Sequence, residues 1–216
     1  PDLAPTLLEV TGVPLDDQMT GSSFLPQLVA TDSGRIDAKR DHTLLGKERH
    51  DIGRTDGELL SVAYPSRALH NDQYLYIRNF ESHRWPVGNP EYGLLNCDDS
   101  PTKTFLTNRA HDPAEKQWYD MSFGKRPKQQ LFDMQNDPDC VEDLAGDPAL
   151  AETVNKLWLQ LKTELKAQGD PRVLGEGEIF DYYPNCRIDR QQKLYGKPDY
   201  DPVQMFQEKF GNQSPD

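Results

Sequence analysis

Hydrophobic positions recur at helical spacing in one long stretch of the chain. Asp147 is the expected cap of this stretch, Pro148 its first residue and Gly169 its end, as is typical of helix ends. Large apolar side chains between them share the spacing of one helix face: Leu150, Val154, Leu157, Trp158, Leu161 and Leu165. Such a face usually packs in a core, so we expect this helix to lie on a sheet rather than to bind a partner.

Shorter hydrophobic patterns predict strands at residues 43–47, 59–69, 74–80 and 130–134. In the third, Leu75 and Ile77 alternate with tyrosines and an arginine, which is the period of a half-buried strand. The polar residues 70–73 before it predict a hairpin turn. Three or four antiparallel strands crossed by one long helix make an α+β fold.

The rest of the chain shows weaker patterns. Helices are predicted after Asp2, which can act as an N-cap, at about 101–108 after Ser100, and near 203–210. Residues 15–41 read as an irregular connector and 81–99 as a long polar loop. We therefore expect a first segment over 1–41, a sheet-and-helix subdomain over 42–169, and an extended tail over 170–216.

Composition limits the partners that the chain can have. Hydrophobic residues make up 35% of it, mean hydropathy is −0.82, and 17 prolines and 15 glycines imply many loops. A complete independent core is therefore not expected, and the connector and tail should pack on another body. The net charge of −12 argues against nucleic acid as a partner, and no apolar run reaches membrane length.

Cysteine and glycosylation signals are sparse. The three cysteines, Cys97, Cys140 and Cys186, are far apart and form no Cys-x-x-Cys pair, which argues against a zinc site. One disulfide could form in an oxidising compartment, and the spacing does not choose a pairing. The residues 212–214 read Asn-Gln-Ser, which fits a glycosylation sequon.

The densest polar cluster is 46–51, Gly-Lys-Glu-Arg-His-Asp, at the end of the first predicted strand. A carboxylate can accept hydrogen bonds from sugar hydroxyls, and the cations can pair with sulfate or carboxylate groups. From composition alone, a solvated charged turn is the more common meaning of such a run.

Several motifs, taken in order, resemble those of formylglycine-dependent (type I) sulfatases. Residues 2–8 read Asp-Leu-Ala-Pro-Thr-Leu-Leu, and 21–28 reads Gly-Ser-Ser-Phe-Leu-Pro-Gln-Leu. Glu-Arg-His at 48–50, Tyr-Pro-Ser-Arg-Ala-Leu at 64–69 and Tyr-Leu-Tyr-Ile-Arg-Asn at 74–79 look like the heparan N-sulfatase branch. Leu-Phe-Asp-Met at 131–134 and Asn-Asp-Pro at 136–138 are similar to the widespread sulfatase ending.

This resemblance implies the C-terminal subdomain of an alkaline-phosphatase-like sulfatase, acting on sulfate esters or N-sulfate groups of a sulfated carbohydrate. The nucleophile and the calcium ligands would lie upstream, so no catalytic residue and no metal ligand is expected here. The chain would pack on the missing N-terminal catalytic domain. The resemblance also implies a periplasmic, secreted or lysosomal protein, whose signal peptide is not visible here.

Three residues are expected to bind substrate. The resemblance assigns Glu48 and His50 to sugar contacts, and Arg67 could pair with an anionic group of the substrate or, structurally, with Glu48. The stretch from Ala63 to Arg67 mimics the activation signature Cys/Ser-x-Pro-Ser-Arg, but Ala63 has no side-chain oxygen or sulfur to oxidise. We therefore expect the isolated chain to be inactive.

A hypothesis from another class remains open, a non-catalytic polysaccharide-binding or scaffolding module that reuses the same sheet. The coding sequence upstream would discriminate between the two.

Overall fold

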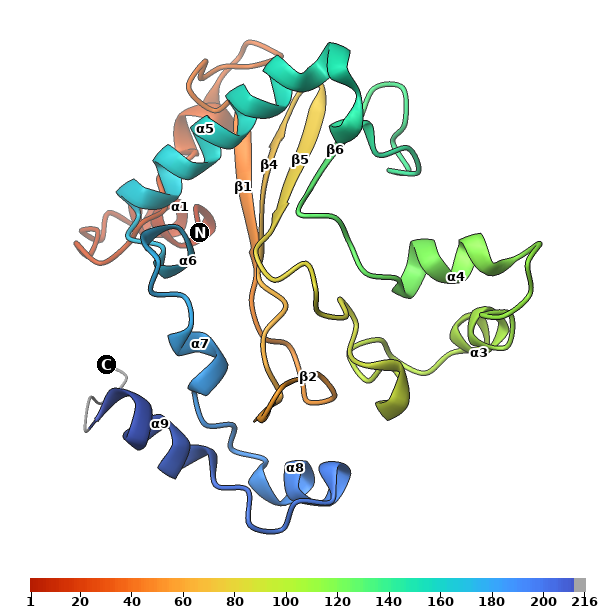
Figure 1. Ribbon diagram of the computed structural model, residues 1–216. Coiled ribbons are helices and arrows are strands. Elements are labelled where there is room, and N and C mark those ends of the chain that lie inside the picture. Colours follow the sequence, from red (N-terminus) through yellow and green to blue (C-terminus); the bar gives the residue numbers. More distant parts are fainter. Residues whose placement is uncertain (212–216) are drawn as a thin grey trace. The chain divides into compact units, whose positions relative to one another are not determined.

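The computed structural model describes residues 1–211, so the sequon at 212–214 lies outside the described residues. Contacts divide the chain into two units, Pro1–His42 and a second that begins at Thr43 (Figure 1). The residues of the expected tail thus share a unit with the sheet. No helix in the described part is long and apolar enough to cross a membrane.

The first unit contains helix α1 (Leu3–Thr11), as predicted, and a short helix α2 (Leu25–Val29). Gly12 ends α1 in the left-handed conformation, with φ of 71°. Asp2 makes no side-chain cap, contrary to the prediction. Its carboxylate instead accepts from the backbone N–H of Ser22 at 3.0 Å and pairs with Arg40 at 2.5 Å. The Arg40 hydrogen bond lowers the pKa of Asp2.

The second unit is built on a sheet in the order β1-β4-β5-β6. Its strands are β1 (His42–Lys47), β4 (Ser66–Asn71), β5 (Tyr74–Asn79) and β6 (Gln129–Asp133). The pairs β4–β5 and β5–β6 are antiparallel, and Tyr76 lies opposite both Leu69 and Leu131. In the predicted hairpin turn, Asn71 Oδ1 accepts from the N–H groups of Gln73 and Tyr74 at 3.0 and 2.7 Å.

The long helix α5 (Ala151–Ala167) crosses the sheet as predicted (Figure 1). Its apolar face and one face of the sheet form the core of the unit: Leu69, Tyr76, Leu131, Val154, Leu157, Leu161 and Leu165. Trp158 is only half-buried at the margin of this core. Within β5, Tyr76 is the fully buried side chain, whereas Leu75 and Ile77 are half-buried.

The strand predicted at 59–69 is interrupted. Its ends form β3 (Leu59–Leu60), paired with β2 (Thr55–Asp56), and β4. Between them Ser61 adopts a left-handed conformation with φ of 62°, which no strand accommodates. Pro65 then lacks the N–H that a central strand would use. The hydrophobic pattern therefore spans two strands and the irregular segment between them, not one strand.

Helix α3 (Pro101–Thr107) was predicted, and Ser100 Oγ caps it by accepting from the N–H of Lys103 at 3.1 Å. Helix α4 (Lys116–Phe123) and the 3-10 turns η1 (Pro90–Tyr92) and η2 (Leu144–Gly146) were not predicted. The predicted start of the long helix, with Asp147 as its cap, is the 3-10 turn η3 (Pro148–Leu150). Residues 170–211 are not an extended tail. They contain α6 (Pro171–Leu174), α7 (Ile179–Tyr182), α8 (Ile188–Tyr195) and the predicted last helix α9 (Pro202–Phe210).

Candidate functional site

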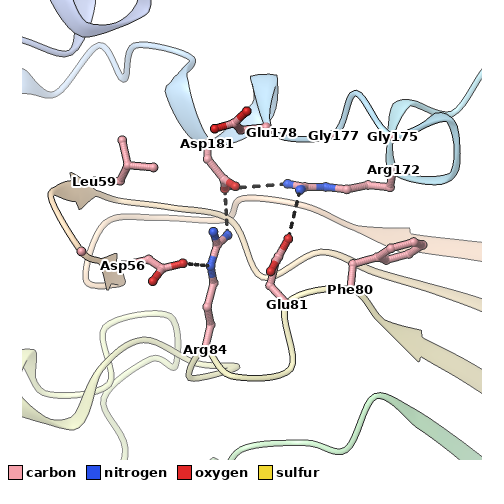
Figure 2. Close-up of a pocket in the computed structure, with 11 residues that line it drawn as sticks. Asp56, Leu59, Phe80, Glu81, Arg84, Arg172, Gly175, Gly177, Glu178 and Asp181 are labelled. Atoms are coloured by element: carbon pink, nitrogen blue, oxygen red, sulfur yellow. Dashed lines mark hydrogen bonds and ion pairs between the residues drawn. The ribbon is translucent and has the colours of Figure 1, made fainter. Parts of the chain in front are cut away.

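A pocket of about 600 Å³ opens in the second unit, within the size range of small-molecule sites. Three segments meet there: the β2–β3 hairpin, the turn that follows β5, and the α6–α7 region (Figure 2). Charged side chains and glycines dominate its lining: Asp56, Gly57, Leu59, Phe80, Glu81, Arg84, Arg172, Gly175, Gly177, Glu178 and Asp181. This lining suits a polar, hydroxyl-rich ligand.

Asp181 is the centre of the pocket's ion pairs (Figure 2). Its Oδ1 lies 3.0 Å from Arg84 Nη1 and 3.7 Å from Arg172 Nη2, and accepts from the N–H of Ala63 at 2.8 Å. Arg84 also donates to Asp56 at 2.8 Å. Partial burial alone would raise the pKa of Asp56, but the hydrogen bonds from His83 and Arg84 outweigh it, so the pKa of Asp56 is lowered. Both arginines are therefore rigidly held by carboxylates.

A second set of ion pairs lies next to the pocket and shares Arg172 with it. The carboxylate of Glu48 accepts from Arg67 at 2.8 Å and from Arg172 at 3.0 Å. Arg67 also donates to Asp170 at 2.6 Å. Burial alone would lower the pKa of Arg67, but the carboxylates of Asp170 and Glu48 outweigh it, so the pKa of Arg67 is raised. The end of β1, the strand β4 and the start of α6 are thereby fixed to one another.

The structure brings two of the three predicted substrate residues together. Glu48 and Arg67 form the ion pair that the structural alternative described, and Arg67 is nearly buried. His50 is exposed and makes no hydrogen bond or ion pair with residues 1–211. A substrate role for Glu48, His50 and Arg67 stays a prediction.

Ala63 has a structural role. It is fully buried, its N–H donates to Asp181, and its carbonyl oxygen accepts from Arg84 Nη1 at 3.0 Å. The signature-like stretch is thus part of the framework that holds the pocket's ion pairs.

Arg54, which the sequence reasoning overlooked, holds the long loop 81–99. It is fully buried and donates to the carbonyl oxygens of Trp85, Pro86 and Val62 at 2.6, 2.8 and 3.0 Å. A fourth bond reaches Asn96 Oδ1 at 2.6 Å. Burial, together with the nearby charge of Arg84, lowers the pKa of Arg54 to about 10.

Two residues of the long loop 81–99 contact nearby lysines. Trp85 packs under Lys125, whose Nζ lies 5.3 Å from the ring centroid. Asp99 pairs with the buried Lys103 at 3.0 Å. Within residues 1–211, no three His, Cys, Asp or Glu side chains converge on a possible metal site.

Several pocket residues could not be found from the sequence. Asp181, Arg172 and Glu178 belong to the stretch that was read as a tail without periodicity. Arg84 lies in the stretch 81–99, which was read only as a long polar loop. The one available signal is the excess of charged residues in a proline- and glycine-containing segment, and that signal is not specific.

No family model matches the chain. Over 179 residues it is 29% identical to an ulvan-active sulfatase of Formosa agariphila, an alignment that covers 82% of the chain and 30% of that protein. Over 200 residues it is 24% identical to human N-sulphoglucosamine sulphohydrolase, covering 86% of the chain and 36% of that protein.

Among solved structures, it is similar to BT1596, a 2-O GAG sulfatase, at 16% identity and a TM-score of 0.43. It is also similar to BT4656 in complex with its substrate D-glucosamine-2-N,6-O-disulfate, at 15% identity and a TM-score of 0.46. Each similarity covers 79% of this chain and 25% of the other.

The chain spans about a third of the length of the curated relatives it matches. The resemblance drawn from its motifs is confirmed by these relatives, since the similarity extends over more than four fifths of its residues. The chain is thus similar to part of three curated sulfatases, two of them ulvan-active sulfatases and one an N-sulphoglucosamine sulphohydrolase.

Proposed function

We propose that these residues form the C-terminal part of a sulfatase that hydrolyses sulfate esters or N-sulfate groups on a sulfated glycan. The observation that carries this proposal is the similarity to sulfatases over 82–86% of the chain. By the same resemblance, the protein acts in the periplasm, in a lysosome or outside the cell.

In this proposal, the second unit supplies one wall of the substrate site. Its pocket offers the carboxylates of Glu81 and Glu178, which are partly exposed and can accept hydrogen bonds from sugar hydroxyls. Arg84 and Arg172 are held in place by carboxylates and so keep their orientation when a ligand arrives. Contacts of this kind position the substrate without breaking bonds.

The reacting groups are proposed to lie elsewhere in a longer protein. The sequence has no Cys/Ser-x-Pro-Ser-Arg motif, because Ala63 occupies the first position of its one similar stretch. In the family implied by the motifs, a formylglycine would supply the nucleophile, and a calcium ion held by residues outside this chain would supply charge neutralisation at the sulfate. The residues described here contribute no step to that chemistry, and the unit is proposed to pack on the domain that does.

The test is sulfate release by the intact protein from sulfated glycans, measured by ion chromatography, with the 216-residue chain assayed in parallel. We expect release by the intact protein and none by the isolated chain. Release by the isolated chain would contradict the proposed division of labour. Binding of the glycan by the intact protein without any release would instead support the non-catalytic module.

A further inference from the structure

The pocket between the β2–β3 hairpin, the turn after β5 and the α6–α7 region carries an excess of negative charge. Its lining contains four carboxylates and two guanidinium groups, namely Asp56, Glu81, Glu178 and Asp181 against Arg84 and Arg172. The outside groups that pair with this lining add one carboxylate, Glu48, and two cations, Lys209 and a protonated His83. The sign of the charge is therefore negative whether or not these neighbours are included.

The two arginines are not available to an anionic ligand. The side chains of Arg84 and Arg172 are only 6% and 4% exposed. The dashed lines from both guanidinium groups end on carboxylates (Figure 2), and Arg172 lies a further 3.0 Å from Glu48. Among the described residues, no other cation lines this pocket. A sulfate or carboxylate of a ligand would therefore have to displace a carboxylate of the protein.

The accessible part of the lining is acidic and apolar instead. Glu178, Glu81 and Asp56 are at least partly exposed, and their ionised carboxylates accept hydrogen bonds but cannot donate them. Leu59 and Phe80 are half-buried and add apolar surface on which the C–H face of a sugar ring can pack. Such a lining is complementary to hydrogen-bond donors and to positive charge.

We propose that this pocket binds a sugar unit that carries hydroxyl or amino groups and no acidic group. Hydroxyl groups donate to the accessible carboxylates, and an ammonium group pairs with them, whereas a sulfate or uronate group meets like charge. The inference deepens the proposed function and rests on it for the ligand class. It also places the sulfate-bearing unit of the glycan outside this pocket.

The test is calorimetric titration of the intact protein with glucose, glucosamine and glucuronate at neutral pH and low salt. None of these sugars carries sulfate, so the site of sulfate hydrolysis is not probed. We expect the unaltered protein to bind glucose and glucosamine, and to bind glucuronate at least about tenfold more weakly, because like charges repel at short range.

Glu178→Gln and Glu81→Gln should each lower the affinity for glucosamine and raise that for glucuronate, by about threefold, as for partly exposed charges. Glucose should bind almost as before, since the glutamine oxygen still accepts a hydrogen bond. High salt should reduce the contrast between the charged sugars. A structural defect would instead weaken the binding of all three sugars alike, and thermal melting shows whether each variant is folded.

Glu152→Gln is the matched control, because Glu152 is an exposed glutamate on α5 outside the pocket lining. This variant loses the same charge from the protein and should bind all three sugars as the unaltered protein does. An equally large shift in Glu152→Gln would assign the effect to net charge and overturn the proposal.

The proposal would also be overturned if the unaltered protein bound none of the sugars or all three equally. Folded Glu178→Gln and Glu81→Gln variants without the opposite shifts would contradict it as well. Sulfate release distinguishes these failures from failure of the proposed function. If the opposite shifts appear and the protein releases no sulfate, the pocket selectivity stands and the sulfatase assignment fails. If sulfate is released and the shifts are absent, the reverse holds.

Discussion

The carboxylate of Asp181 lies 3.0 Å from the guanidinium of Arg84, although 97 residues separate them in the sequence. Both side chains are almost completely buried. The pair joins α7 to the turn after β5, and Asp181 also receives the N–H of Ala63. The segment after α5 is therefore an integral part of the second unit and contributes to its pocket.

Replacing Asp181 with Ala should destabilise the protein by about 3–5 kcal/mol, because it leaves the buried charge of Arg84 without this partner. Chemical denaturation of the intact protein measures the change. The matched control is Glu178→Gln in the same segment, whose partner Lys209 lies 2.9 Å away and whose side chain is 54% exposed. It should change the free energy of unfolding by at most about 1 kcal/mol. Similar values for both would show that the Asp181 pair is not buried in solution.

Leu161→Ala should cost about 3–5 kcal/mol, since Leu161 is fully buried between α5 and the sheet. Trp158→Ala should cost less, about 1–3 kcal/mol, because Trp158 is half-buried and contacts Arg78, whose guanidinium carbon lies 4.6 Å from its ring. Leu159, 66% exposed on the opposite face, is the control and should tolerate Ala within about 0.5 kcal/mol. Urea denaturation measures the free energy of unfolding of the three variants. A loss for Leu159→Ala as large as that for Leu161→Ala would contradict the packing described here.

Stability at high pH should depend on Tyr64. Burial raises the pKa of Tyr64 to about 12, above its ordinary value of 10.0. The neutral phenol therefore favours the folded state fully below pH 10, and this contribution is lost as the pH rises from 10 to 12. Relative to Tyr64→Phe, the unaltered protein should lose roughly 1–3 kcal/mol across this window. The measurement is the free energy of unfolding of the two proteins at pH 9, 10, 11 and 12. An equal fall in both proteins would contradict the raised pKa of Tyr64.

Glu48→Ala and His50→Ala should affect activity in different ways. Glu48 holds Arg67 and Arg172, so its loss should disturb the framework and lower kcat/KM for both a sulfated glycan and a small aryl sulfate. His50 is exposed and unpaired among residues 1–211, so its loss should lower kcat/KM about tenfold for the glycan alone. The measurement is kcat/KM of each variant in the intact protein with both substrates. Equal losses for His50→Ala on the two substrates would remove it from glycan recognition.

The elements that the sequence predicted well have regular, local causes. The helix 151–167 follows from its apolar period, and α3 follows from Ser100 and Pro101 at its start. The α+β class follows from such elements, because a long amphipathic helix and short alternating strands must cover each other. The period of β5 was recognised, but the alternation alone does not say which set of side chains faces the core, and Tyr76 is the one that is fully buried.

The elements that were missed depend on distant partners. Helices α6, α7 and α8 have too few residues for a clear period, and side chains from other segments stabilise this region, as Asp181 does through Arg84. Likewise, Arg54 binds carbonyl groups 8 to 32 residues away, a relationship without a local signal. For the site, the Glu48–Arg67 pair was foreseen as an alternative, whereas Arg172 was not.

The long separation between Arg84 and Asp181 also affects biosynthesis. Translation proceeds at about 5–20 residues per second, so Asp181 is added roughly 5–20 s after Arg84. During that interval, Arg84 has the carboxylate of Asp56 but not that of Asp181, and the pocket has two of its three walls. The charge of Arg84 therefore gains its second carboxylate only after α7 has been synthesised.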